Sequence, residues 1–353
     1  MDITKIGALG RQGRRMAGVA LAVAAALAGM AWYVRRESRA VDAALPPQGE
    51  ILDIDGVLVH CVSRGDGPVV VLLHGNGSRS EELESSGLVA RLARDHRVLM
   101  IDRPGFGHSE RPDSVDWTPS AQASLVARVL GQLGVERATV LGHSWGTLVA
   151  LALALDHPRL VAALVLVSGY YYPTLRPDTL LLSMPAWPVL GTLVRNTTSP
   201  VFSRLAWPAL RSIAFGPAPA PERFRQLPAW AFLRPRSLKA AAQESGMMIA
   251  QTGALAQRYG ELRVPVSILA GESDRIVDPH GQVERLQREL GDAQSTTIPG
   301  AGHMLHHADP DLVADAVTEV ERRAERSVGV THALVPEVTA LQPQFAVSVR
   351  AAD

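Results

Sequence analysis

The chain has 353 residues, enough for one large domain or two smaller ones, and its 35 basic residues balance its 35 acidic ones. A net charge of zero gives no indication of a nucleic-acid partner. The one cysteine, Cys61, excludes both a disulfide within the chain and a zinc site built from several cysteines.

An apolar stretch lies near the N-terminus. Residues 16–34 form an uncharged run of 19 residues, which at about 1.5 Å per residue just crosses a hydrocarbon core of roughly 30 Å. Trp32 and Tyr33 stand where an interfacial aromatic pair would stand. We interpret the run as a transmembrane anchor within an N-terminal segment, 1–48, that ends in a linker from residue 40. A cleaved signal peptide and an alanine-rich surface helix are the alternatives.

Basic residues on the two sides of this run bear on its orientation. Those before it are Lys5, Arg11, Arg14 and Arg15, and those after it are Arg35, Arg36 and Arg39. The small excess on the N-terminal side favours a cytoplasmic N-terminus. We therefore expect a single-pass membrane protein whose main domain lies on the extracytoplasmic side.

From residue 49 the chain alternates apolar strands with helical patterns, which predicts βαβ units and a parallel sheet. Asp55-Gly56 indicates a hairpin between the first two strands. The predicted strands are 50–55, 57–62, 69–73, 97–101, 138–141, 160–167, 266–270 and 295–298. The predicted helices are 81–94, 119–133, 147–155, 279–290 and 310–326.

This alternation is interrupted in the second half of the chain. Residues 171–262 hold 11 of the 24 prolines and three of the six tryptophans. We expect short helical pieces there, among them 200–215 and 237–259. The sequence thus predicts a core in two parts, 49–170 and 263–326, with a helical cap at 171–262 between them. Residues 327–353 have no clear period and are expected to form a tail.

Gly142-His143-Ser144-Trp145-Gly146 reads G-x-S-x-G between a predicted strand and a predicted helix. A sharp turn of this kind holds its serine in a strained conformation with the hydroxyl exposed. Gly142 and Gly146 remove side chains that would collide where strand and helix approach each other. The pattern therefore predicts a nucleophilic Ser144.

A serine hydroxyl needs a base to take its proton, and the base needs a third group that orients it. Two loops at predicted strand ends supply these groups in the order acid, then histidine. We assign Asp274, in Gly271-Glu272-Ser273-Asp274, as the acid and His303, in Gly300-Ala301-Gly302-His303, as the base. The local alternatives are Glu272 and Asp278 for the acid, and His306 and His307 for the base.

Acyl transfer also needs donors for a developing oxyanion. We expect these to be the backbone N–H groups of Trp145 and of Asn76, in the loop His74-Gly75-Asn76-Gly77. The Trp145 indole is expected to line the pocket. We interpret His74, Asp102 and His108 as structural. The sequence has no glycine loop for phosphate, and we do not interpret His306-His307 with Asp309 as a metal site, so we expect neither a cofactor nor a metal.

Together these motifs resemble those of the α/β-hydrolase superfamily over about 50–326. The resemblance implies a mostly parallel, eight-stranded sheet with helices on both faces, and a helical cap inserted after the sixth strand. It rests on His74-Gly75-Asn76-Gly77, Asp102-Arg103-Pro104-Gly105-Phe106-Gly107-His108-Ser109, the G-x-S-x-G turn and the loops that end in Asp274 and His303.

The branch of the superfamily bears on the reaction. Haloalkane dehalogenases and epoxide hydrolases use an aspartate nucleophile, which Ser144 argues against. Proline iminopeptidases share Ser-Trp-Gly but carry His-Gly-Gly-Pro-Gly where this chain has His74-Gly75-Asn76-Gly77-Ser78. We expect carboxylic ester hydrolysis through an acyl-enzyme on Ser144. Carbon–carbon bond hydrolases, cofactor-free haloperoxidases and iminopeptidase-like enzymes are the alternatives within the fold, and a non-catalytic binding protein is the alternative from another class.

The composition of the cap segment bears on the substrate. Residues 171–262 hold ten Lys/Arg and four Asp/Glu, interleaved with aromatic residues. We interpret this as an apolar underside with arginines directed outward. The alternative is a cap that rests on an anionic membrane surface and admits acyl lipids. The expected partners are a small apolar ester or acyl substrate and, through the N-terminal helix, a membrane.

Overall fold

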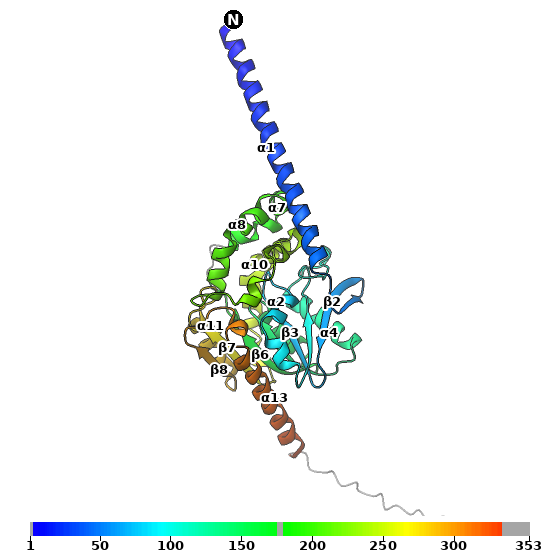
Figure 1. The fold of residues 1–353 in the computed structure, drawn as a ribbon. Coiled ribbons are helices and arrows are strands. Elements are labelled where there is room, and N and C mark those ends of the chain that lie inside the picture. The colour runs from blue at the N-terminus through cyan, green and yellow to red at the C-terminus, as the bar shows by residue number, and fades with distance from the viewer. Residues whose placement is uncertain (1–2, 175–178, 334–353) are drawn as a thin grey trace, which may run out of the picture.

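The computed structural model describes residues 3–174 and 179–333 (Figure 1). Its centre is an eight-stranded sheet in the order β1-β2-β4-β3-β5-β6-β7-β8. The β1–β2 and β2–β4 pairs are antiparallel and the other five are parallel. This confirms the predicted mostly parallel sheet. Its strands are β1 (Glu50–Ile54), β2 (Val57–Arg64), β3 (Val69–Leu73), β4 (Arg97–Ile101), β5 (Ala138–His143), β6 (Val161–Val167), β7 (Val266–Gly271) and β8 (Gln294–Ile298).

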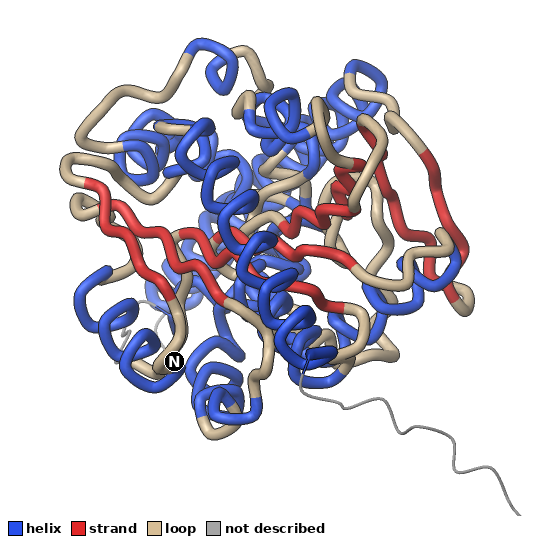
Figure 2. Tube along the Cα trace, turned by 90° about the horizontal axis from the view of Figure 1, so that it is seen from below, coloured by secondary structure: helices blue, strands red, loops and turns tan. Residues whose placement is uncertain are grey.

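Helices cover both faces of the sheet, as Figure 2 shows. Successive residues of a strand point to opposite faces, so Val140 packs in one apolar cluster and Leu141 in the other. Helices α4 (Pro119–Gln132), α5 (Gly146–Asp156) and α11 (Pro279–Leu290) contribute to the first cluster. The second is completed by α2 (Ser80–Ser85), α3 (Leu88–Leu92), α12 (Leu305–Ala308) and α13 (Pro310–Ala333).

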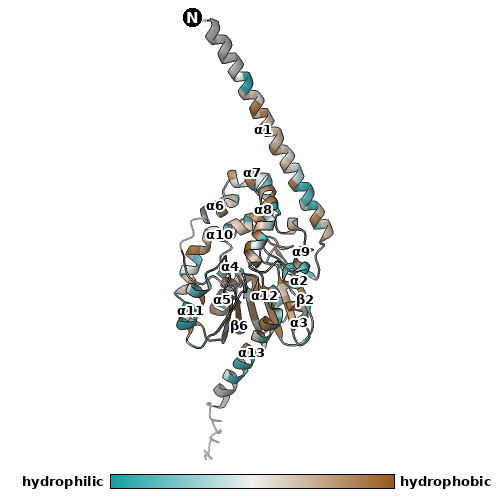
Figure 3. Ribbon diagram, turned by 60° about the vertical axis from the view of Figure 1, so that its left-hand side comes forward, coloured by the Kyte–Doolittle hydropathy of each residue, from teal (hydrophilic) through white to brown (hydrophobic). Residues whose placement is uncertain are grey.

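Helices fill the segment between β6 and β7 and lie over one end of the sheet (Figure 3). Most are short, as the proline-rich composition predicted, but α8 and α10 have 18 and 22 residues. The division of the chain into domains at these points stays a prediction. The inserted elements are α6 (Thr179–Ser183), η1 (Met184–Ala186), α7 (Leu190–Asn196), α8 (Thr198–Phe215), α9 (Glu222–Arg225), η2 (Ala229–Ala231), α10 (Pro235–Ala256) and η3 (Tyr259–Glu261). We refer to them together as the cap.

The N-terminal helix α1 (Ile3–Ala44) projects far beyond the rest of the chain (Figure 1). Within the described residues it is the one helix that is long and apolar enough to cross a membrane. The linker predicted from residue 40 was wrong at its start, because the helix continues to Ala44. Val34 and Val41 are buried there in one apolar cluster with Phe224 and Trp230 of the cap, and this packing stabilises the last turns of the helix.

Two other predicted helices have different limits. The helix predicted over 81–94 is split into α2 and α3 by Gly87, whose φ of 91° does not fit a right-handed helix. The last helix does not end at Arg326 but continues as α13 to Ala333, since no proline interrupts it before Pro336. The remainder of the predicted tail, 334–353, lies outside the described residues.

Candidate active site

Ser144 occupies a sharp turn between β5 and α5. Its φ is +52°, in the left-handed region that non-glycine residues rarely adopt. The Ser144 N–H donates to the carbonyl oxygen of Val167 at 2.9 Å, which ties the turn to the neighbouring strand β6. A strained serine held this way by its surroundings agrees with the conformation predicted for the motif.

The glycines on either side of the turn lie in close contact with backbone. A Cβ on Gly146 would lie 2.1 Å from the carbonyl oxygen of Leu73, and a Cβ on Gly142 would lie 2.5 Å from that of Gly146. Neither position can hold a side chain unless the backbone moves. The prediction that strand and helix approach too closely for side chains here is confirmed.

His303 and Asp274 meet at the C-terminal edge of the sheet. His303 Nδ1 and Asp274 Oδ2 are 2.7 Å apart, and both side chains are almost fully buried. The other carboxylate oxygen, Oδ1, accepts from the N–H groups of Ile276 at 2.8 Å and Val277 at 3.0 Å. Asp274 is thereby held in one orientation and can fix the His303 ring with Nε2 directed away from the acid.

Ser144 and His303 line the same cavity. The hydrogen bonds among the described residues do not include one between the Ser144 hydroxyl and His303. A relay of this kind often tightens only when substrate binds. The arrangement agrees with the predicted positions of Ser144, His303 and Asp274, while their roles as nucleophile, base and orienting acid stay predictions.

The local alternatives to Asp274 and His303 have other contacts. Glu272 is exposed, and Asp278 caps α11 by accepting from the N–H groups of His280 and Gly281, both at 3.2 Å. His306 and His307 both direct Nε2 at Oε1 of Glu82, at 2.7 and 2.6 Å.

Glu82, His306 and His307 form a buried cluster that sequence analysis did not identify. Three possible ligand atoms lie within 4.8 Å of one another. The Glu82 carboxylate also accepts from the Ser78 hydroxyl at 2.6 Å, so protein donors already satisfy both of its oxygens. Asp309, which the sequence places beside the histidines, accepts instead from the N–H of Leu312 in α13, at 2.9 Å.

The burial and hydrogen bonds of this cluster determine which of its side chains are charged. Burial alone would raise the pKa of Glu82, but His306 and His307 hold that pKa well below its usual value. Burial lowers the pKa of His306. Both lowered pKa values agree with an ionised Glu82 that accepts a hydrogen bond from a neutral His306.

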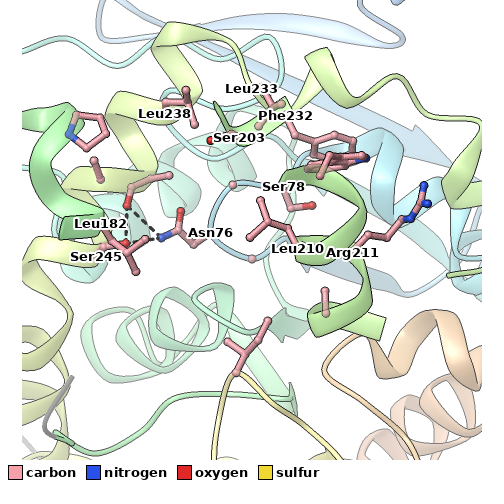
Figure 4. A pocket seen from close by; sticks show the side chains of 18 of the residues that line it. Asn76, Ser78, Leu182, Ser203, Leu210, Arg211, Phe232, Leu233, Leu238 and Ser245 are labelled. Atoms are coloured by element: carbon pink, nitrogen blue, oxygen red, sulfur yellow. Dashed lines mark hydrogen bonds between the residues drawn. The ribbon is translucent and has the colours of Figure 1, made fainter. Parts of the chain in front are cut away.

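The loop after β3 carries the second expected oxyanion donor. Gly75 and Asn76 line the cavity beside Ser144. The Asn76 side chain donates to the Ala241 carbonyl oxygen at 3.1 Å and to Ser245 Oγ at 3.3 Å, both on α10 of the cap (Figure 4). The loop is therefore held from above by the cap, while the donor role of its N–H stays a prediction.

The indole of Trp145 was misplaced by the sequence analysis. Its side chain is buried in the core cluster with Trp117 and Leu148, and it is absent from the cavity lining among the described residues. Trp145 stands directly before α5, so its ring follows the helix into the core while its backbone stays beside Ser144. Only the main chain of this residue can contribute to the cavity.

Arg103 supports the same loop from below, a role that sequence analysis missed. It is fully buried and donates to the carbonyl oxygens of His74 at 2.8 Å and Gly75 at 2.9 Å. Its guanidinium also pairs with Glu244 of α10. The available signal was that Glu244 is the one carboxylate in the 22 residues of α10.

His74 and Asp102 have the structural roles that were predicted for them. His74 Nδ1 lies 2.8 Å from the Gly75 carbonyl oxygen, and Nε2 accepts from the Arg103 N–H at 3.0 Å. Burial lowers the pKa of His74 to about 4, so the ring stays neutral. Asp102 accepts from the N–H groups of Ser80 at 2.7 Å and His108 at 2.9 Å, and His60 Nδ1 lies 2.6 Å from it.

The cavity above Ser144 has a volume of about 760 Å³, large enough for an organic molecule of moderate size. The cap contributes mostly apolar walls, together with the polar side chains of Thr198, Ser199, Ser203, Arg211 and Ser245. Figure 4 shows several of these side chains pointing into the space. The apolar lining includes Leu182, Phe202, Trp207, Leu210, Phe232 and Leu238.

The chain is similar in sequence and fold to several known proteins. An uncharacterised protein from Mycobacterium tuberculosis is 28% identical over 293 residues, covering 80% of this chain and 84% of that protein. A pimeloyl-(acyl-carrier protein) methyl ester esterase from Aeromonas hydrophila is 29% identical over 257 residues, covering 72% and 95%. Among solved structures, the epoxide hydrolase CorEH superposes with a TM-score of 0.65 at 20% identity, covering 78% of this chain and 98% of that one.

A family model described as alpha/beta hydrolase fold matches residues 68–310. The match spans more than half of the chain and contains the Ser144 turn, the cap, Asp274 and His303. This protein belongs to the alpha/beta hydrolase fold family.

Proposed function

We propose that this hydrolase cleaves carboxylic esters through an acyl-enzyme on Ser144. The observation that carries the proposal is the His303–Asp274 hydrogen bond, 2.7 Å long, at the cavity that Ser144 also lines. A serine at this position supports ester chemistry over reactions that need a carboxylate nucleophile. The similar Aeromonas protein is named as a methyl ester esterase.

The reaction proceeds in two steps. His303 Nε2 takes the proton from Ser144 as the hydroxyl oxygen attacks the acyl carbon, and Asp274 stabilises the charged imidazole. The backbone N–H groups of Asn76 and Trp145 stabilise the oxyanion. The alcohol leaves with the proton from His303, and water then attacks the acyl-enzyme with His303 again as base.

The apolar lining of the cavity favours an ester with an apolar acyl or alkyl group. Leu182, Phe202 and Leu210 offer contact to a chain and few hydrogen-bond partners. We expect short p-nitrophenyl esters to be accepted as well, because a cavity of about 760 Å³ has room for a short acyl chain and the nitrophenyl ring.

The test is hydrolysis of p-nitrophenyl esters together with labelling by a fluorophosphonate probe, which reacts with activated serines. Ser144→Ala should lower kcat by on the order of 10⁶-fold and abolish labelling. Ser295→Ala, on the edge strand β8, is the matched control and should do neither. Wild-type turnover by Ser144→Ala contradicts the proposal, and an unlabelled wild-type protein would indicate a binding protein instead.

We also propose that α1 anchors the protein in a membrane with the main domain on the extracytoplasmic side. The length and apolar composition of α1 support an anchor, and the basic residues that precede residue 16 support this orientation. A C-terminal alkaline phosphatase fusion should be active and a green fluorescent protein fusion dark. The reverse result would invert the orientation, and a soluble, processed protein would contradict the anchor.

A further inference from the structure

Exposed hydrophobic side chains are concentrated in two segments of the described chain. Of twenty large hydrophobic side chains that are exposed, six lie on α1 and ten lie between residues 181 and 213 of the cap. Phe202 and Leu205 on α8 are exposed by 66% and 72%. The other eight of this cap surface are Leu181, Leu182, Trp187, Val189, Leu190, Leu193, Leu210 and Ile213. Patches of this kind mark contact with a partner or a membrane.

The two apolar segments belong to the same end of the molecule. The last turns of α1 pack on the cap through Val34 and Val41, and Tyr33 meets Trp230 edge to face with ring centroids 5.6 Å apart. Asp42 accepts from the buried Arg234 guanidinium at 2.5 Å. From there α1 runs outward past α7 and α8, whereas α13 leaves from the opposite end (Figures 1 and 3).

The apolar cap surface continues into the cavity. Leu181, Leu182, Phe202 and Leu210 are exposed at the surface and also line the cavity that reaches Ser144. An apolar chain could therefore pass from the surface of α6 and α8 to the serine without leaving hydrophobic contact.

The charge of residues 179–215 indicates which kind of partner this apolar surface contacts. Residues 179–215 contain three arginines, Arg195, Arg204 and Arg211, and no acidic residue. Apolar helices that carry only positive charge suit the surface of a bilayer with anionic headgroups. Residues 16–34 of α1 are uncharged on every side, which a lipid environment matches and a single protein face does not.

We propose that α6, α7 and α8 rest in the same bilayer surface that α1 enters, and that an acyl ester passes from the lipid through this surface to Ser144. The route of the substrate rests on the proposed ester hydrolysis. The docking of the cap rests only on the apolar surface, the charge and the position of α1.

The docking is tested with the full chain in phosphatidylcholine–phosphatidylglycerol nanodiscs. Cys61 is buried, so Leu205→Cys offers one reactive thiol for an environment-sensitive fluorophore. Glu325→Cys, on exposed α13 at the other end, is the matched control. Bromine-bearing lipid tails should quench the label at 205 at least threefold more than the label at 325. Equal quenching overturns the proposal, as does a signal at 205 that follows protein concentration and not lipid, which would indicate a second copy on this surface.

The substrate route is tested by a double variant, Leu193→Ser with Leu205→Ser, neither of which lines the cavity. Hydrolysis of a long-chain ester embedded in vesicles should fall about tenfold, and hydrolysis of a short soluble ester should stay at the wild-type rate. Ile249→Ser, an exposed cap position outside this surface, should change neither. Unchanged hydrolysis of the embedded ester overturns the route. A wild-type protein that cleaves no ester would contradict the proposed function and leave the quenching test to decide docking.

Discussion

Arg103 and Glu244 form a fully buried ion pair that joins the loop beside Ser144 to the cap. Arg103 Nη2 lies 3.2 Å from Glu244 Oε2, and Gln122 Nε2 donates to Glu244 Oε1 at 3.1 Å. The same guanidinium holds the carbonyl oxygens of His74 and Gly75. A single buried cation thus fixes the position of two parts of the chain that are 141 residues apart.

Glu244→Gln should therefore be strongly destabilising. It leaves the Arg103 charge buried without its carboxylate, and breaking such a pair costs about 3–5 kcal/mol of the free energy of unfolding. Urea unfolding measures the loss. Glu84→Gln, which removes a partly exposed pair with Arg64, should cost less than about 1 kcal/mol. If both variants lose the same free energy of unfolding, the buried pair contributes no more to stability than the partly exposed one.

Asp274→Asn should lower kcat by on the order of 10⁴-fold, because an amide at this position favours the wrong tautomer of His303. The free energy of unfolding should change little, since the asparagine oxygen can still accept from the Ile276 and Val277 N–H groups. Asp278→Asn is the control and should keep near wild-type turnover, because asparagine caps a helix as well as aspartate does. If the loss of turnover follows Asp278 instead, the acid is wrongly assigned.

Gly146→Ala should impair both stability and turnover. The new methyl group would meet the Leu73 carbonyl oxygen at 2.1 Å, so either the Ser144 turn or the loop after β3 must move. Gly131→Ala is the matched control in α4, where a Cβ meets nothing within 4 Å. That substitution should stabilise the protein by roughly 0.5–1 kcal/mol. Thermal unfolding measures the stability of each variant, and ester hydrolysis measures its turnover. A fully active and stable Gly146→Ala variant would contradict the close packing.

Stability should fall on acidification because of the Glu82 cluster. The folded protein resists protonation at His306, whose pKa burial lowers, so below about pH 6.5 the unfolded chain binds a proton that the folded chain does not. Below about pH 4.5 the same holds for Glu82, whose folded pKa is also lowered. Both effects reduce the free energy of unfolding as pH falls.

The measurement is urea unfolding between pH 8 and pH 4. His306→Gln should flatten the dependence between pH 7 and pH 5, and the exposed His280→Gln should leave it unchanged. A slope that His306→Gln does not alter would assign the acid sensitivity to other groups.

The parts of this protein that could be predicted from sequence are those where local pattern and topology agree. Asp274 and His303 each follow a recognisable strand, and parallel strands present their C-terminal ends at one edge of the sheet. Contacts between distant segments carry no such local period. Glu82 contacts His306, which lies 224 residues later in the chain. Val41 packs on a cap that begins only after the first six strands of the sheet. Trp145 shows the same limit at a single residue, since its main chain and its indole face different environments.

The two hydrogen bonds from Asn76 to α10 have a consequence for how this enzyme can be altered. Helix α10 lines the cavity and also holds the loop that carries an expected oxyanion donor. Exchanging the cap for that of a relative would therefore disturb the rate of reaction as well as the choice of substrate. An engineered chimera would need to retain Ala241, Glu244 and Ser245, so that the new walls are grafted around a helix that stays in place.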